Sequence, residues 1–246
     1  MPIIHDDERA TVVWGDWRET LAVAQERGGV DALIVDAPYS ERTHAGHDAA
    51  SDAANGLGRR AINYAPWSGQ DVTEFVSASV SVVRGWIVSV TDDVLAVVWR
   101  DALEASGMCS FTALPYVIPN GRVRLSGDGP STWSSWIAVA RPRSRAFARW
   151  GTLPGAYIVP PGERERPSWV GGKNLWLMTS LISDYSRRGD VVCDPCSGGG
   201  TTARAARILG RRFIGGDCDE KAARETARVV SAAREQIALP FAADGG

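Results

Sequence analysis

Lysine, cysteine and long apolar runs are all scarce in this chain of 246 residues. Only Lys173 and Lys221 are lysines among the 27 basic residues, so arginine supplies nearly all of the positive charge. Four cysteines at uneven spacing argue against a disulfide scaffold in a chain of this length. No apolar run reaches the roughly 18 residues that span a bilayer, and the first residues do not form a signal peptide. We therefore expect a protein of the reducing cytoplasm that does not bind membranes.

The overall composition is that of an ordinary globular protein, with 44% hydrophobic and 23% charged residues. The net charge of −2 alone argues against a strongly basic nucleic-acid binder. The charge is unevenly distributed, however, because residues 120–173 carry a net charge of +6 and the rest of the chain −8. The basic residues of that window are Arg122, Arg124, Arg141, Arg143, Arg145, Arg149, Arg164, Arg166 and Lys173. This segregation predicts one basic face on an acidic body.

Strand-like and helix-like segments alternate along the chain. The clearest buried strand is Asp31–Asp36, where four apolar residues stand between two acids and Pro38 ends the run. Further strands are expected at 11–14, 86–90, 109–118, 133–140, 190–193 and 212–215, and helices at 17–27, 72–84, 93–106, 174–187, 201–209 and 219–236. Asp71 is expected to cap the second helix. This alternation predicts an α/β fold with a doubly wound, Rossmann-like, mostly parallel sheet.

Two segments show no clear periodicity. Residues 40–70 are expected to form a long loop, and residues 141–172 an irregular surface element rich in proline, glycine and arginine. We expect residues 1–246 to form a single domain, with a small recognition segment at 120–172 between its two halves. Ligands of such sheets bind at the carboxyl ends of the strands, where both motifs described next are expected.

The first motif is a glycine-rich turn. After the strand at 190–193 come Asp194, Pro195 and Cys196, then three consecutive glycines at 198–200 and Thr201 and Thr202 at the start of a helix. Glycines let the backbone approach a ligand closely. Asp217 follows the first of these glycines by 19 residues, which is the spacing of an acid that binds ribose hydroxyls. Asp194 suits a ligand with a cationic end better than a pyrophosphate, so a dinucleotide is not required.

Two pairs of residues have the spacing of metal ligands. Cys193 and Cys196 form a C-x-x-C without a second pair, and we expect them to pack as small apolar groups. His44 and His47 lie in a polar loop without further ligands nearby. We therefore predict no metal site.

The second motif is Asp36-Ala37-Pro38-Tyr39, directly after a buried strand. The exocyclic amine of adenine or cytosine is a poor nucleophile, because its lone pair is delocalised into the ring. A carboxylate and a backbone carbonyl that each accept one N–H localise that lone pair, and Asp36 can stabilise positive charge as a methyl group arrives. Tyr39 can stack on an extruded base, a contact worth ~1–3 kcal/mol. Taken alone, this tetrapeptide would be read as structural.

Taken together, these motifs resemble the β-class DNA amino-methyltransferases. That family carries an Asp-Pro-Pro-Tyr motif first, then a recognition segment, then a lysine-containing helix and an Asp-Pro-x-x-Gly-x-Gly-Thr turn. The same order appears here in Asp36–Tyr39, the basic segment, Lys173, and Asp194–Thr202. The departures are Ala37 for the first proline, Cys196 for phenylalanine, Gly199 for serine, and Asn174 for the proline that follows the lysine.

The resemblance implies a permuted class I methyltransferase that uses S-adenosylmethionine. The implied cofactor-binding residues are Asp16, Lys173, Asp194, Pro195, Cys196, Gly198, Gly200, Thr201, Thr202 and Asp217. The catalytic residues would be Asp36, Ala37, Pro38 and Tyr39. Because cytosine-N4 members tend to begin the tetrapeptide with serine, Asp36 favours adenine N6. Such an enzyme would act in the cytoplasm of a bacterium, whether encoded by the host or by a phage.

The partner implied by the resemblance is DNA, bound by Arg122, Arg124, Arg141, Arg143, Arg145 and Arg149. Three alternatives stay open: a cytosine-N4 methyltransferase, a methyltransferase of RNA or of a protein amide, and a non-catalytic nucleic-acid binder. The sequence also leaves open whether the protein forms a homodimer.

Overall fold

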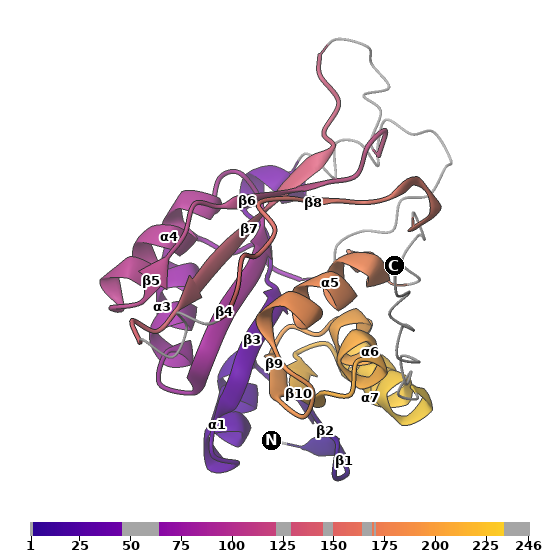
Figure 1. The fold of residues 1–246 in the computed structure, drawn as a ribbon. Helices are drawn as coiled ribbons and strands as arrows, with labels where there is room; N and C mark the ends of the chain where they lie inside the picture. The colour runs from indigo at the N-terminus through magenta and orange to yellow at the C-terminus, as the bar shows by residue number, and fades with distance from the viewer. Residues whose placement is uncertain are drawn as a thin grey trace, which may run out of the picture.

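The computed structural model describes residues 2–45, 64–121, 129–144, 150–163, 169 and 171–233. They form a three-layer α/β/α arrangement with one mixed sheet in the middle (Figure 1). The strands are β1 (Ile3–Asp6), β2 (Ala10–Trp14), β3 (Val30–Asp36), β4 (Val83–Thr91), β5 (Cys109–Ser110), β6 (Leu114–Val117), β7 (Ser134–Arg141), β8 (Tyr157–Ile158), β9 (Val191–Asp194) and β10 (Arg212–Asp217). The helices are α1 (Trp17–Glu26), α3 (Gly69–Ser79), α4 (Ala96–Ala105), α5 (Leu175–Tyr185), α6 (Thr201–Ile208) and α7 (Glu220–Ala232), with a 3₁₀ turn at Pro161–Glu163.

The sheet has the order β1-β2-β10-β9-β3-β4-β7-β6-β8, and β5 pairs with β7. Its five central strands are parallel to one another, and they are β2, β10, β9, β3 and β4. The flanks add antiparallel pairs, β1 with β2 on one side and β7 with β4 on the other. The expected mostly parallel, doubly wound sheet is confirmed for the centre, and β9 from the second half of the chain lies between β10 and β3.

Alternate strand residues point to opposite faces of the sheet, so both faces carry apolar side chains that helices must cover. Of the helices named above, three pack on each face. Leu33 and Val35 of β3 pack in the core beneath α1, α3 and α4. Ala32 and Ile34 of the same strand pack in the core beneath α5, α6 and α7. Both cores contain fully buried aromatic rings, such as Trp99 on the first face and Tyr185 on the second. The two cores therefore fix β3 and β9 side by side.

The structure corrects several predicted boundaries. Helix α3 begins at Gly69 rather than at residue 72, because Ser68 and not Asp71 is its N-cap. Asp71 takes the third helical position, and its carboxylate accepts a hydrogen bond from the backbone N–H of Ser68, which completes a capping box. The helix also ends at Ser79, so that Val83 and Arg84 belong to β4.

Three further differences concern the flanks of the sheet. No local pattern predicts β1, a short edge strand whose four residues are half-buried or exposed. The strand expected at 109–118 is two strands, β5 and β6. The irregular element expected at 141–172 contributes β8, which adds to the sheet beside β6.

Candidate active site

Three acidic residues end neighbouring strands at the carboxyl edge of the sheet. Asp36 is the last residue of β3, Asp194 of β9 and Asp217 of β10. The strand order places β9 between β10 and β3, so the three acids lie along one edge. The two motifs recognised in the sequence, 158 residues apart between Asp36 and Asp194, therefore meet at one place.

The glycine-rich turn is held against β10 by Asp217. Its carboxylate accepts hydrogen bonds from the backbone N–H of Gly198 and of Asp219, both at 2.9 Å. Gly198 and Gly200 have φ values of +50° and +80°, a conformation that other residues rarely adopt. Gly200 is the N-cap of α6, so Thr201 and the buried Thr202 begin that helix. The turn thus presents the N-terminus of a helix beside an acidic side chain.

Trp169 lies directly on the glycine-rich turn. A Cβ atom added at Gly199 would come within 2.4 Å of the Cβ atom of Trp169. A serine at this position, as in the family pattern, would clash with the tryptophan. The departure at Gly199 therefore has a steric reason, and Trp169 is a residue that the sequence analysis missed.

The carboxyl groups at this edge are buried and close to one another. Burial, together with the charges of Asp36 and Asp217, raises the pKa of Asp194 to about 7, against hydrogen bonds from Thr202 and Cys196 that lower it. Burial also raises the pKa of Asp217. Asp194 is only 1% exposed. Because like charges in a buried site repel each other, the arrangement favours a ligand that brings positive charge.

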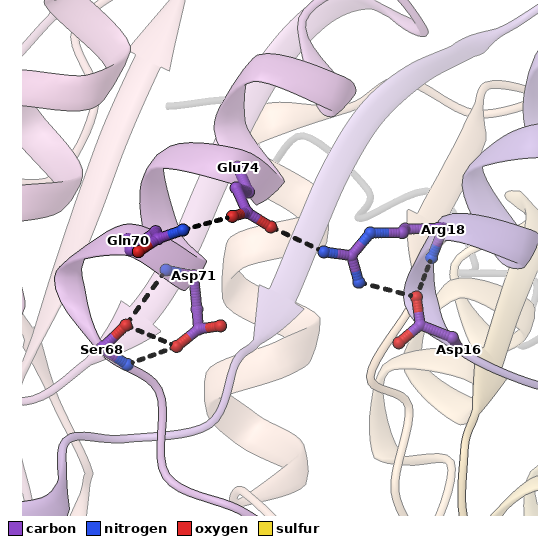
Figure 2. Close-up of polar contacts among 6 residues, drawn as sticks. All are labelled: Asp16, Arg18, Ser68, Gln70, Asp71 and Glu74. Atoms are coloured by element: carbon purple, nitrogen blue, oxygen red, sulfur yellow. Dashed lines mark hydrogen bonds and ion pairs between the residues drawn. The ribbon is translucent and has the colours of Figure 1, made fainter.

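Asp16 lies at the same edge, in the turn between β2 and α1. It caps α1, and the neighbouring Gly15 donates its backbone N–H to the carbonyl oxygen of Asp217 at 3.0 Å. Figure 2 shows Arg18 between Asp16 and Glu74 of α3. Its Nη1 atom donates to Asp16 Oδ1 at 3.2 Å, and its Nη2 atom donates to Glu74 Oε2 at 2.7 Å. These exposed ion pairs contribute little stability. The cap and the bond from Gly15 to Asp217 hold the turn at the carboxyl edge, beside the predicted cofactor site.

Lys173 forms an ion pair with Asp36. Its Nζ atom lies 2.7 Å from both carboxylate oxygens, and the two side chains are only 14% and 20% exposed. The same ammonium lies 4.7 Å from the centre of the Tyr39 ring, within the range of a cation–π contact. Lys173 precedes α5, whose N-cap is Asn174 through a hydrogen bond to the N–H of Trp176. Asparagine in place of proline is therefore compatible with the start of this helix.

Unpartnered polar atoms gather around this ion pair. Within the described residues, Tyr39 Oη and Tyr116 Oη are buried and have no hydrogen-bond partner. Buried polar groups are normally paired, so such a cluster is typical of a site that receives a polar ligand. Burial raises the pKa of Tyr116 and of Tyr64 to about 12, so that both phenols stay protonated at neutral pH. The sequence analysis missed both tyrosines, because an isolated tyrosine in a strand or loop carries no local signal.

Asp92 positions the chain that follows the tetrapeptide. Its carboxylate accepts hydrogen bonds from Ser40 N at 2.9 Å, from Ser40 Oγ at 2.5 Å and from Thr43 Oγ1 at 2.6 Å. Burial alone would raise the pKa of Asp92, but hydrogen bonds from Ser40 and Thr43 outweigh it and lower that pKa. Asp92 directly follows β4, which pairs with β3. An acid at the end of a strand next to β3 is the sequence feature that could have predicted this role.

We expect Asp92→Ala to lower the free energy of unfolding by about 2–3 kcal/mol, because it leaves buried donors without an acceptor. Amide hydrogen exchange at Ser40 should accelerate in the same variant. Asp93→Ala removes a neighbouring but exposed acid and is the matched control. Equal urea unfolding curves for the two variants would contradict the positioning role of Asp92.

Both cysteines of the pair pack with the hydrophobic core, as expected. Cys193 is fully buried in the core beneath α1, α3 and α4, where burial raises its pKa. Cys196 is partly buried, and its backbone N–H donates to Asp194 at 3.1 Å. Ala37 is buried, Pro38 is half-buried, and Pro195 is buried under the turn. His44 packs edge-on against Tyr64, and His47 lies outside the described residues.

Of the predicted DNA-binding arginines, Arg141 and Arg143 lie among the described residues. Strand β7 runs antiparallel to β4, with Trp136 opposite Thr91 and Ala140 opposite Ile87. Arg141 therefore lies toward the amino edge of the sheet, about 14 Å along β7 from Ile137, which is level with Asp36. Its Nη1 atom donates to the carbonyl of Pro142, and the exposed Arg143 follows it. Arg122, Arg124, Arg145 and Arg149 lie outside the described residues.

The family comparison agrees with this geometry. Residues 141–228 match the family model for DNA methylases of the N6/N4 type. The chain is also 39% identical over 57 residues to the type II methyltransferase M2.DpnII of Streptococcus pneumoniae, a stretch that covers 22% of this chain and 21% of that protein. The matched stretch thus spans about a fifth of the curated relative. The resemblance inferred from the sequence, to DNA amino-methyltransferases of the β class, is confirmed.

Solved structures share the fold over nearly the whole chain. The structure of M1.HpyAVI in complex with SAM matches with a TM-score of 0.66 at 20% identity, covering 90% of this chain and 98% of that one. A putative DNA modification methylase from Thermus thermophilus, complexed with S-adenosyl-L-methionine, matches with a TM-score of 0.59 at 21% identity, and the match covers 95% of this chain and 100% of that one. The cytosine-N4-specific PvuII DNA methyltransferase matches with a TM-score of 0.61 at 11% identity, and the match covers 90% of this chain and 86% of that one. The fold is therefore that of the class I methyltransferases. None of the described helices has the length and apolar character that a bilayer crossing requires.

Proposed function

We propose that this protein is an S-adenosylmethionine-dependent DNA methyltransferase that modifies the exocyclic amine of an extruded base. The observation that carries this proposal is the meeting of the two motifs, with Asp36 on β3 beside Asp194 and Asp217 on β9 and β10. One motif has the chemistry to bind a cationic nucleoside, and the other has the chemistry to activate an aromatic amine.

The residues present fit S-adenosylmethionine. This cofactor carries positive charge on its sulfonium and its α-amino group, which the buried and mutually repelling Asp194 and Asp217 favour. Asp217 has further lone pairs for ribose hydroxyls, because each of its oxygens accepts one backbone hydrogen bond. The glycines at 198–200 let the backbone turn tightly into α6, with Trp169 packed on Gly199. When bound, the cofactor supplies an electrophilic methyl group.

The side chains around Asp36 would prepare the acceptor. Asp36 accepts an N–H of the amine and stabilises positive charge as the new bond forms, which is electrostatic catalysis. Tyr39 offers a ring for stacking, and the protonated Tyr116 hydroxyl offers a donor from β6. The departure at Ala37 keeps a backbone carbonyl, so the second N–H can be accepted as in the family pattern.

Adenine N6 is the finer part of the proposal. It is supported by Asp36 at the first position of the tetrapeptide, where cytosine-N4 members tend to carry serine. The alternative is cytosine N4, and the fold favours neither base, since a cytosine-N4-specific enzyme shares it. The cytoplasm and a homodimer stay predictions.

Methyl transfer by the full chain tests this function directly. The protein is incubated with tritiated S-adenosylmethionine and equal amounts of duplex DNA, RNA and a protein mixture. Label in DNA is expected, and label in RNA or protein alone would overturn the DNA assignment. Sequencing of DNA from expressing cells then reports N6-methyladenine or N4-methylcytosine and the site in which it occurs. Absence of cofactor binding by calorimetry would favour a non-catalytic binder.

The placement of the strands predicts which arginines contact DNA. Strand β6 ends and β7 begins at the edge where Asp36 lies, so the described ends of their connection, Gly121 and Gly129, flank that edge in the chain. Arg141 and Arg143 lie at and after the other end of β7. Replacing Arg122 and Arg124 by alanine should therefore reduce the salt slope of DNA binding by about 1.8, or about 0.9 for each lost phosphate contact. The matched control, Arg141→Ala with Arg143→Ala, should leave the slope unchanged in a fluorescence-anisotropy titration. A salt slope that falls in the Arg141 and Arg143 variant but not in the Arg122 and Arg124 variant would instead indicate that DNA binds at the amino edge of the sheet.

A further inference from the structure

Lys173 is the one lysine of this arginine-rich chain that is buried. The other lysine, Lys221, is exposed on α7. The Lys173 side chain is 14% exposed, and its charge meets the carboxylate of Asp36 at 2.7 Å. A lysine offers a compact ammonium, whereas the planar guanidinium of arginine takes more space. The chain thus places a point charge at the only acid of the predicted catalytic tetrapeptide.

The backbone around Lys173 is fixed on both sides. Gly172 N donates to the carbonyl of Trp169 at 3.2 Å, and Asn174 caps α5 while its amide nitrogen donates to the carbonyl of Glu163. Lys173 therefore reaches Asp36 from a held loop on the α5 side of the sheet. The resemblance implied that Lys173 binds the cofactor, but its ammonium is directed at the acceptor half of the site and lies over the ring of Tyr39.

From these contacts we infer that Lys173 is a positioning residue for Asp36: it keeps that carboxylate ionised and oriented for the incoming amine. The inference rests on the proposed function. Burial raises the pKa of Asp36, and Lys173 opposes that rise. A protonated Asp36 would lose the negative charge that stabilises the transition state. An ionised carboxylate offers about four lone-pair sites, so Asp36 can hold Lys173 and still accept an N–H from a base.

Other charged and titratable groups surround Asp36 from every element packed against it. They are Tyr39 after β3, Tyr64 before α3, Tyr116 on β6, Asp194 on β9 and Cys196 after β9. The tyrosines and Cys196 are neutral at pH 7, and Asp194 adds negative charge when it is ionised, which would favour protonation of Asp36. Lys173 is thus the only cation among the described groups that face Asp36.

The test compares Lys173→Met with Lys173→Arg and with Lys221→Met, the matched loss of an exposed lysine. The pKa of Asp36 is measured by carbon-13 NMR on aspartate-labelled protein, with its signal assigned from Asp36→Asn. In Lys173→Met this pKa should rise by about 1–3 pH units, because an adjacent positive charge is lost. Lys173→Arg should reverse most of that rise, and Lys221→Met should match the wild type. The acidic limb of the pH profile for methyl transfer should move upward by the same amount.

Affinity for S-adenosylmethionine, measured by calorimetry, separates this role from cofactor binding. We expect Lys173→Met to change the Kd less than threefold. An unchanged Asp36 pKa would overturn the inference, and a tenfold loss of affinity with that unchanged pKa would assign Lys173 to the cofactor. The NMR titration needs no reaction, so a wild-type protein that methylates nothing would refute the proposed function alone.

Discussion

Asp36→Ala is expected to reduce methyl transfer to DNA by roughly 10²–10³-fold or more, while the Kd for S-adenosylmethionine changes less than threefold. The reason is geometric. Asp36 ends β3 and faces Lys173 and Tyr39, whereas the turn predicted to bind the cofactor is tied to Asp217 at the end of β10. The measurements are single-turnover methyl transfer and calorimetric cofactor titration on the same preparation.

Folding must be controlled in this experiment, because Asp36→Ala leaves the buried ammonium of Lys173 without its partner. Removing one member of a buried pair commonly destabilises a protein by about 3–5 kcal/mol. Asp36→Asn keeps the shape, and Asp36→Ala with Lys173→Met removes both charges. All three variants should lose transfer, and the double variant should regain stability in urea unfolding. Equal loss of transfer and cofactor binding in the stable variants would mean that Asp36 serves the cofactor.

Local sequence patterns were sufficient to predict the central strands and the order of the two motifs. The apolar run at Asp31–Asp36 and the glycines at 198–200 carry their structure within a few residues, because burial and backbone freedom are local requirements. The N-cap of α3 was misassigned because Ser68 and Asp71 are both good caps, and only the capping box distinguishes them.

Contacts between distant segments were not predictable in this way. Lys173 and Asp36 are 137 residues apart, and Tyr116 enters the site from a strand that no local pattern links to catalysis. The arginine window shows the opposite problem. Its residues are neighbours in the sequence, but β7 carries Arg141 away from the edge that β6 approaches. Charge density along the chain alone therefore does not tell at which edge of the sheet Arg141 lies.

Asp194→Asn is expected to weaken S-adenosylmethionine binding and at the same time to stabilise the protein at neutral and alkaline pH. Asp194 is buried, and its pKa of about 7 lies well above the ordinary value of 3.8. The folded state therefore keeps a proton that the unfolded state loses, and stability falls as the pH rises from about 4 to about 7. An asparagine at this position carries no charge at any pH and can still accept the hydrogen bond from Cys196 N.

The stability advantage of Asp194→Asn over the wild type should therefore grow between pH 4 and pH 7 and become constant above pH 7. Its upper limit is about 4 kcal/mol, from ~1.4 kcal/mol for each pH unit of displacement. Urea unfolding at four pH values measures the advantage, and Asp93→Asn, which removes an exposed acid, should show none of it. A bound cation offsets the same repulsion, so saturating S-adenosylmethionine should stabilise the wild type far more than the variant. An advantage that does not depend on pH would show that Asp194 is ionised in the folded protein at all these pH values, and its carboxylate would then need another source of compensation.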